Sequence, residues 1–355
     1  MLQKTRLLII DDSLLIRTMI KSIVSNDPCI EVVGEAADPI EARDKIKRLN
    51  PDVVTLDVEM PKMDGISFLE KIMALRPMPV VMVSTLTQKG ADVTIRALEL
   101  GAVDYVAKPL NQDLTVIGPE LISKIKIARS AKIRQSGRQA FTDQTHQPLP
   151  SQTGYSKKLI AVGSSTGGVE SLYDIILRLP ANCPPVVIAQ HISKGFSERF
   201  AVRVNKSSTV TVKEACHGEK LAPGTVYIGQ GGKHFTIKKS GYNYYCQVTE
   251  DTDGESYRPS VDRLFCSVAN VIGAAAVGVI LTGMGKDGAR GLLTMRRTGA
   301  PTLGQDEASS IVYGMPKAAM MAGAVEKQVS LSRMAEEIIS ACTLSTMPKK
   351  AGATG

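Results

Sequence analysis

The sequence has few of the features that mark metal-binding, disulfide-rich or base-stacking proteins. Its six cysteines form no CxxC pair, and no histidine lies at zinc-finger spacing from any of them. Aromatic residues make up only 4% of the chain, and they do not interleave with basic residues as in stacking platforms for nucleic-acid bases. The scattered cysteines predict reduced thiols in a cytosolic protein. They are Cys29, Cys183, Cys216, Cys246, Cys266 and Cys342.

Long apolar runs are also missing. Met1–Arg6 leads directly into a predicted strand and does not resemble a signal peptide. The longest apolar segment, Val268–Leu281, contains Gly273 and Gly278 and falls short of the about 20 residues that a membrane-spanning helix needs. We therefore predict a cytoplasmic protein with no membrane insertion.

The excess of positive charge is modest and concentrated in one stretch. The formal net charge is +8. Much of the excess lies in six residues: Lys124, Lys126, Arg129, Lys132, Arg134 and Arg138. We interpret them as a solvated helix end and tether, although a DNA-binding output domain is the competing hypothesis. No helix-turn-helix pattern follows the stretch, so we expect no nucleic-acid partner.

What the sequence does contain is a repeated alternation of apolar runs and amphipathic segments. In the first 110 residues this alternation is typical of a doubly wound parallel sheet. The runs predicted as strands are Leu7–Ile10, Ile30–Val33, Val53–Leu56, Val80–Val83 and Tyr105–Ala107. The segments predicted as helices are Leu14–Ser25, Pro39–Leu49, Ile66–Leu75 and Ala91–Leu100, with a last helix inside Asp113–Lys132.

The second half predicts another α/β domain, after the aperiodic linker Gln135–Ser156. Its clearest strands are Leu159–Val162, Val186–Ala189 and Val277–Leu281, and its clearest helices are Val169–Leu179, Val261–Val271 and Arg333–Cys342. A β-rich middle, about Val210–Gln247, is predicted as an antiparallel insert. The chain of 355 residues thus predicts two doubly wound parallel-sheet domains.

Polar residues follow the strands of the first half, at the ends where functional groups of open parallel sheets gather. Asp11 and Asp12 end the first strand, and Asp57 ends the third; Ser84 ends the fourth, and Lys108 follows the fifth. Three carboxylates beside an ammonium group suit Mg²⁺, which prefers oxygen ligands. Asp57 could accept a phosphoryl group, whose oxygens Lys108 and Ser84 would hold. Any one aspartate here is more often a turn former, but five such groups together favour a site.

These residues resemble the bacterial response-regulator receiver family over about Thr5–Ile127. The motifs that carry the resemblance are Leu56–Pro61, Asp64-Gly65 and Lys108-Pro109. The resemblance implies that Asp57 is phosphorylated and that Ser84 and Tyr105 form a switch pair near Lys108. It also implies a cis peptide bond between residues 108 and 109, a form found almost only before proline.

A second constellation lies in the second half. Gly163–Gly168 joins a strand to a helix and fits the GxSxG spacing, with Ser165 in the middle. A serine nucleophile needs a base and an acid. His191 and Asp287 each follow another apolar strand, and the glycines around Met284 free its backbone to bind an oxyanion. A phosphate-cradling loop is the alternative, but the chain contains no GK[ST] motif.

The chain order Ser, His, Asp differs from the order in α/β-hydrolases. It matches the chemotaxis protein-glutamate methylesterase (CheB) family, which this sequence resembles over almost all of Leu159–Ile339. The motifs are Val162–Gly168, Gln190-His191, Arg258–Asp262, Leu281–Gly288 and Gly314–Pro316. The resemblance places Ser165, His191 and Asp287 on the catalytic triad and Met284 on the oxyanion position. Ser164 stands where the family often has alanine, so the nucleophile is assigned by alignment.

The resemblance also implies the biology. One triad would hydrolyse glutamate methyl esters and deamidate glutamines of chemoreceptors for sensory adaptation, with no cofactor for hydrolysis. A chemotaxis histidine kinase would be the phosphodonor, and the unphosphorylated receiver would block the active site. The expected divisions are a receiver at 1–128, a linker at 129–156, a methylesterase domain at 157–345 and a tail at 346–355. A hydrolase of small esters is a further alternative.

Overall fold

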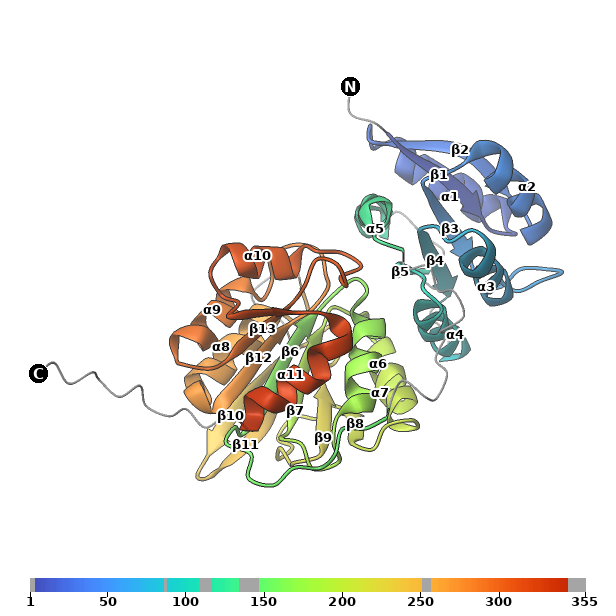
Figure 1. Ribbon diagram of the computed structural model, residues 1–355. Coiled ribbons are helices and arrows are strands. Elements are labelled where there is room, and N and C mark those ends of the chain that lie inside the picture. Colours follow the sequence, from blue (N-terminus) through green and yellow to red (C-terminus); the bar gives the residue numbers. More distant parts are fainter. Residues whose placement is uncertain (1–3, 86–87, 109–116, 134–146, 251–256, 344–355) are drawn as a thin grey trace, which may run out of the picture.

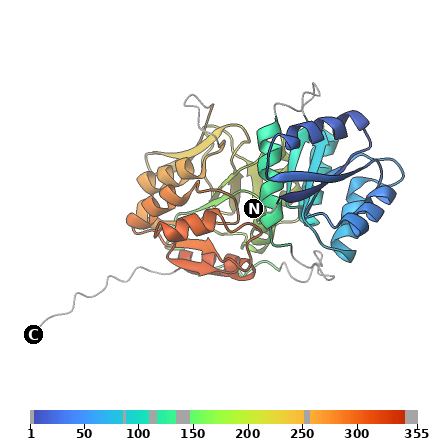
Figure 2. The ribbon, with the colours of Figure 1, turned by 90° about the horizontal axis from the view of Figure 1, so that it is seen from above.

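The chain was examined as a computed structural model, which describes residues 4–85, 88–108, 117–133, 147–250 and 257–343. Two α/β units lie side by side, the first in blue to cyan and the second in green to red (Figures 1 and 2).

The first unit is a five-stranded parallel sheet with the order β2-β1-β3-β4-β5. Its strands are β1 (Thr5–Ile10), β2 (Ile30–Ala36), β3 (Val53–Asp57), β4 (Val80–Thr85) and β5 (Asp104–Lys108). Its helices are α1 (Leu14–Ser25), α2 (Pro39–Leu49), α3 (Gly65–Leu75), α4 (Gln88–Glu99) and α5 (Gly118–Ser130). This strand order is that of the flavodoxin-like doubly wound fold.

The alternation of side chains along β1 shows why helices cover both faces. Leu7 and Ile9 are buried in a cluster with residues of α1 and α5, whereas Leu8 and Ile10 are buried in a cluster with residues of α2 and α3. A strand that is apolar on both faces cannot leave either face in water, so the sheet becomes the middle layer of three.

The second unit is built on a seven-stranded parallel sheet with the order β14-β13-β12-β6-β7-β9-β8. Its strands are β6 (Leu159–Ser164), β7 (Val186–Gln190), β8 (Thr211–Glu214), β9 (Thr225–Ile228), β12 (Ala276–Ile280), β13 (Thr302–Gln305) and β14 (Lys327–Val329). The helices are α6 (Gly168–Arg178), α7 (Phe196–Asn205), α8 (Val261–Val271), η2 (Gly273–Ala275), α9 (Ala289–Arg297), α10 (Met315–Met321) and α11 (Leu331–Thr343). A separate hairpin pairs β10 (His234–Ser240) with β11 (Asn243–Thr249).

The predicted fold class is confirmed, with one correction. The antiparallel insert is narrower than predicted, because β8 and β9 pair in parallel with each other and β9 pairs in parallel with β7. Among the strands that the structure describes, the antiparallel pair is the hairpin β10–β11, to which Lys220 adds one antiparallel bridge at Tyr245.

The two units pack together through α4, which lies against α6 and α7. Glu99 at the end of α4 accepts hydrogen bonds from two nitrogens of Arg203 in α7, one of them at 2.6 Å. Farther along, Lys132 donates a backbone hydrogen bond to the carbonyl of Ile311 (3.0 Å). The first two residues of β5 lie between these contacts and meet the loops that follow β6 and β7.

The prediction of a solvated basic helix end is wrong for Lys124. Its side chain is only 18% exposed, and its ammonium group pairs with Asp104 (3.1 Å) and Glu120 (2.7 Å). Burial opposes its charge, but the two carboxylates outweigh that effect and raise the pKa of Lys124. Arg134 and Arg138 lie outside the described residues.

None of the helices in the described part of the chain combines the length and apolar character needed to cross a membrane. The six cysteines are all free thiols. Burial raises the pKa of Cys183, Cys246 and Cys342 to about 12, so these three are poor nucleophiles at neutral pH.

Candidate active site

Three adjacent strands in the middle of the second sheet carry the predicted hydrolytic residues. β12, β6 and β7 are neighbours, and Asp287, Ser165 and His191 follow them in that order. The chain moves outward from β6 to β7 on one side and returns to β12 on the other. This is a topological switch point, where the loops at the carboxyl ends of the strands diverge and leave a crevice.

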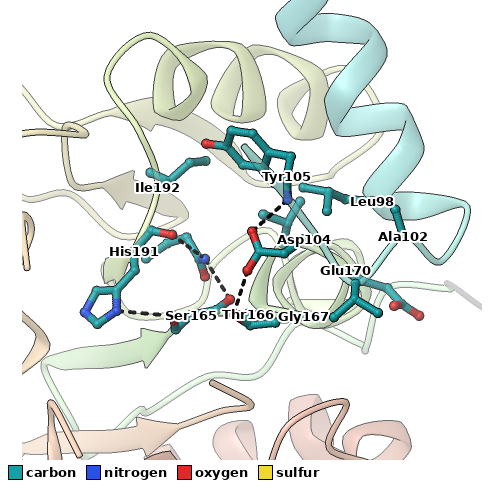
Figure 3. Close-up of a pocket in the computed structure, with 13 residues that line it drawn as sticks. Leu98, Ala102, Asp104, Tyr105, Ser165, Thr166, Gly167, Glu170, His191 and Ile192 are labelled. Carbon is teal, nitrogen blue, oxygen red and sulfur yellow. Dashed lines mark hydrogen bonds between the residues drawn. The ribbon is translucent and has the colours of Figure 1, made fainter. Parts of the chain in front are cut away.

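Ser165, His191 and Asp287 form a continuous hydrogen-bonded series. Nδ1 of His191 lies 3.2 Å from Oγ of Ser165, and Nε2 lies 2.8 Å from Oδ2 of Asp287 (Figure 3 shows the first contact). Ser165 is partly exposed, whereas the side chains of His191 and Asp287 are about nine-tenths buried. A proton on Nε2, donated to Asp287, leaves Nδ1 free to accept the proton of Ser165.

Asp287 is held by the N-terminus of α8. Its carboxylate accepts N–H groups from Val261 (2.8 Å) and Asp262 (2.9 Å) and the hydroxyl of Ser260 (3.1 Å). Burial favours the neutral acid, but the hydrogen bond with His191 and these backbone donors hold the pKa of Asp287 below its usual value. The acid therefore stays ionised at neutral pH and fixes the orientation of the imidazole ring.

Gln190 connects the loop of the serine to the loop of the histidine. Its Nε2 donates to the carbonyl oxygens of Ser165 (2.9 Å) and His191 (3.0 Å). The hydroxyl of Ser164 donates to its Oε1 at 2.5 Å. Ser164 is fully buried, so its hydroxyl faces the interior and not the crevice.

Met284 and Tyr257 border the same crevice. Met284 follows Gly283, where a Cβ atom would lie 2.7 Å from Cβ of Ser165, so only glycine lets this backbone approach the serine so closely. The ring of Tyr257 stacks on His191 with centroids 4.4 Å apart and an interplanar angle of 1°. These two residues shape the space in front of the serine.

The first unit brings together its own predicted cluster. Carboxylate oxygens of Asp11, Asp12 and Asp57 lie within 4.8 Å of one another. Nζ of Lys108 lies 2.7 Å from Asp11 and 2.8 Å from Asp57. Burial and the neighbouring Asp11 outweigh the attraction of Lys108 and raise the pKa of Asp57 to about 6. Three carboxylates and one ammonium group leave a net negative charge, which a divalent cation would neutralise.

Ser84 and Tyr105 have contrasting surroundings. The hydroxyl of Ser84 is buried, and within the described residues it has no hydrogen-bond partner. Tyr105 reaches into the second unit, where its ring stacks on Phe196 (4.3 Å between centroids) and its hydroxyl accepts the N–H of Ser193 (3.1 Å). The predicted cis bond between residues 108 and 109 lies outside the described residues.

Two consecutive residues of β5 contact the two loops that carry the serine and the histidine. Asp104 accepts a hydrogen bond of 2.6 Å from the hydroxyl of Thr166, and both side chains are buried (Figure 3). Tyr105 meets Ser193, two residues after His191. The first unit therefore forms one wall of the crevice.

Comparison with known proteins assigns both units. The CheB methylesterase family profile matches residues 160–338, and the response regulator receiver domain profile matches residues 7–116. The chain belongs to the CheB methylesterase family.

Several relatives match nearly the whole length of the chain. A Caulobacter vibrioides protein named protein-glutamate methylesterase/protein-glutamine glutaminase 1 is 53% identical over 338 residues, which are 95% of this chain and 97% of that protein. A Nitrosomonas europaea protein of the same activity name is 49% identical over 346 residues, 95% of this chain and 96% of that protein. The crystal structure of the Thermotoga maritima CheB methylesterase catalytic domain has a TM-score of 0.51 at 35% identity, covering 52% of this chain and 98% of that one.

Three residues that shape the candidate active site have no role predicted from the sequence. Gln190 was visible only as the neighbour of His191 in a motif. Asp104 precedes the predicted switch residue, but its partner Thr166 is 62 positions away. Tyr257 precedes the Arg258–Asp262 motif, and nothing in its spacing indicates that it stacks on the histidine.

Proposed function

We propose that this protein removes methyl esters from glutamates, and deamidates glutamines, of methyl-accepting chemotaxis receptors, and that phosphorylation of its receiver domain activates it. The observation that carries the proposal is the hydrogen-bonded series Ser165–His191–Asp287 at the carboxyl edge of the second sheet. The names of the relatives supply the ester and amide substrates. We further propose a receiver at 1–128, a linker at 129–156, a catalytic domain at 157–345 and a tail at 346–355.

The proposed reaction is acyl transfer to serine and then to water. Oγ of Ser165 attacks the ester carbonyl while Nδ1 of His191 takes its proton, and Asp287 holds Nε2–H in place. The backbone N–H of Met284 stabilises the oxyanion. The imidazolium gives the proton to the leaving methoxide, which departs as methanol, and water then cleaves the acyl-enzyme by the same route. Ammonia leaves in place of methanol when the substrate is a glutamine.

The receiver domain is proposed to accept its phosphoryl group on Asp57 from a chemotaxis histidine kinase. Asp11, Asp12 and Asp57 would hold Mg²⁺, which would offset the negative charge of the incoming group. Lys108 lies in contact with Asp57, and the buried hydroxyl of Ser84 offers a donor for a phosphoryl oxygen. Both are suited to hold the phosphorylated side chain.

Gating is proposed to act through β5. We call the packing of the receiver domain on the catalytic domain, as seen here, the docked arrangement. Phosphorylation adds about −1.5 to −2 charges at Asp57. Ser84 would move toward the phosphoryl group and Tyr105 would turn inward, which removes the stack on Phe196 and the hydrogen bond from Ser193. The receiver would then separate from the crevice and admit the receptor.

Methanol release from methyl-labelled receptor membranes tests the proposal. We expect Ser165→Ala to abolish release, because the variant lacks the attacking oxygen. Ser164→Ala is the matched control, since its hydroxyl is buried and contacts Gln190. An inactive Ser164→Ala beside an active Ser165→Ala would overturn the assignment. Asp57→Asn should keep the basal rate and lose the stimulation by a small-molecule phosphodonor with Mg²⁺.

A further inference from the structure

The docked arrangement leaves the candidate triad assembled. Both hydrogen bonds of His191 are in place, at 3.2 Å to Ser165 and 2.8 Å to Asp287, although the receiver contacts the neighbouring residues. Gln190 still ties the serine loop to the histidine loop. The receiver therefore does not inhibit by pulling the reacting groups apart, and its effect must lie in what can reach them.

Space remains in front of Ser165. A cavity of about 370 Å³ opens there, and Ser165, His191, Tyr257 and Met284 line it on one side. The receiver lines the other side with residues of β5 and α5, including Tyr105 and Lys124. Binding sites for small molecules have volumes of about 300–1,000 Å³, so this cavity is large enough for a small ligand.

A helical protein substrate does not fit in the same space. An α-helix with its side chains is about 10–12 Å wide and approaches a site as a continuous rod. Residues of β5 and α5, including Tyr105 and Lys124, form the wall of the cavity that faces Ser165, so they occupy the side from which such a rod would approach. Access to Ser165 in the docked arrangement is thus limited by size.

The charges around the cavity favour an uncharged ligand. Lys124 is paired with Asp104 and Glu120, and all three line the cavity together with Arg258. Among the described residues that line the cavity, these two carboxylates and two cationic groups balance in charge. A short neutral acyl ester would enter without leaving a buried charge unpaired, whereas a free carboxylate or ammonium would add one.

We propose that the docked protein hydrolyses small neutral methyl esters without phosphorylation, because the receiver excludes helical substrates and admits small ones. The proposal rests on the triad proposed above and extends it to a second substrate class. Ser165 Oγ forms a bond to the acyl carbon, the bond to methoxide breaks, and methanol leaves with the proton carried by His191. Water then yields the free carboxylic acid and regenerates the serine.

The test compares two substrates of the full-length protein with one readout, methanol release. One is the γ-methyl ester of glutamate with both backbone ends blocked, and the other is methyl-labelled receptor membranes. A phosphodonor with Mg²⁺ should raise the receptor rate at least about tenfold, which is the fold-change expected of a modest shift in population. The small-ester rate should change by less than about twofold, since its access is already open.

Two variants sharpen the comparison. Ser165→Ala should abolish both activities, which ties the small-ester reaction to the same site. Arg203→Ala, which removes the contact with Glu99 in α4, should raise the resting receptor rate and leave the small-ester rate unchanged.

Several outcomes are decisive. Equal stimulation of both substrates, or no hydrolysis of the small ester by the resting protein, would overturn the size-exclusion inference. Ser165-dependent hydrolysis of the small ester with no release from receptor membranes in any condition would instead support this inference and remove the receptor function.

Discussion

Ser164 and Ser165 are neighbouring hydroxyls with opposite surroundings. Ser164 ends β6, is fully buried and donates to Gln190, whereas Ser165 begins the turn and meets His191 at the edge of the crevice. One step along the chain thus separates a side chain that packs in the interior from one that can attack a substrate. Gln190 links the two, because its amide contacts Ser164 and the backbone of both Ser165 and His191.

The role of Gln190 can be measured as a graded series. Ser164→Ala removes one partner of Gln190 and should lower kcat by less than about tenfold. Gln190→Leu removes both donors that tie the two loops together, and a misplacement of about 1 Å in such a site can lower the rate about 10²-fold. We expect this loss in kcat, with KM nearly unchanged, and partial recovery in Gln190→Glu would count against this donor role.

The carboxylates of Asp11, Asp12 and Asp57 should lower the free energy of unfolding of the receiver domain at neutral pH. The pKa of Asp57 is raised to about 6 in the folded chain by burial and by Asp11, against about 3.9 for an unfolded aspartate. The folded state therefore holds this proton more tightly, and stability falls as pH rises through the window from about 4 to about 6. Each pKa unit corresponds to about 1.4 kcal/mol, so ionising Asp57 costs up to about 3 kcal/mol.

Asp57→Asn should therefore stabilise the receiver at neutral pH without Mg²⁺. Thermal unfolding should occur at a higher temperature in the variant than in the wild type. The difference should shrink as pH falls from about 6, and it should be smallest below about pH 4, where Asp57 becomes protonated in both states. Mg²⁺ should stabilise the wild type more than the variant, since it binds the folded carboxylates. An unfolding temperature of the variant below that of the wild type at neutral pH would contradict the claim that the ionised Asp57 carboxylate destabilises the receiver domain.

At the scale of elements, the helices and strands with strong apolar patterns were predicted well. α1, α2 and α8 have the predicted bounds, and the central strands of both sheets lie where the apolar runs indicated. β13 and β14 have only four and three residues, and runs this short have no periodicity to read. The direction of β8 and β9 depends on the path of the ten residues 215–224 between them, which the strands themselves do not specify.

The site was predictable to the extent that it follows strand ends. Loops at the carboxyl edge of a parallel sheet converge, so Ser165, His191 and Asp287 could be grouped from sequence alone. Contacts between the two units were not predictable, because no periodicity relates Asp104 to Thr166 or Tyr105 to Phe196. These contacts depend on how the surfaces of the two folded units fit together.

The contact between α4 and α7 offers a test of docking. Arg203 donates two hydrogen bonds to Glu99, whose side chain is about nine-tenths buried. Arg203→Ala and Glu99→Ala should each raise the resting receptor demethylation rate a few-fold, because a partly buried pair of this kind contributes about 1 kcal/mol. The double variant should add little to either single variant. Arg333→Ala, which loses a pair with Glu337 inside the catalytic domain, is the control and should change nothing.

At the scale of the whole molecule, the single strand β5 reaches from the acidic cluster of the receiver domain to the crevice of the catalytic domain. β5 carries Lys108 at the proposed phosphorylation cluster, and Asp104 and Tyr105 at the wall of the candidate hydrolytic crevice. Lys108, which contacts Asp57, is thus only three positions from Tyr105 and four from Asp104, which contact the catalytic loops. In the proposed gating the signal needs no path through the catalytic core, because the receiver domain itself obstructs the crevice.

The most direct measurement of this account is the rate of methanol release from receptor membranes by a fragment that lacks residues 1 to 150. The fragment keeps Ser165, His191 and Asp287 and loses the wall formed by β5 and α5. The account predicts a rate above that of the resting full-length protein, with no response to a phosphodonor. A folded fragment that is no faster than the resting full-length protein would contradict gating by the docked receiver.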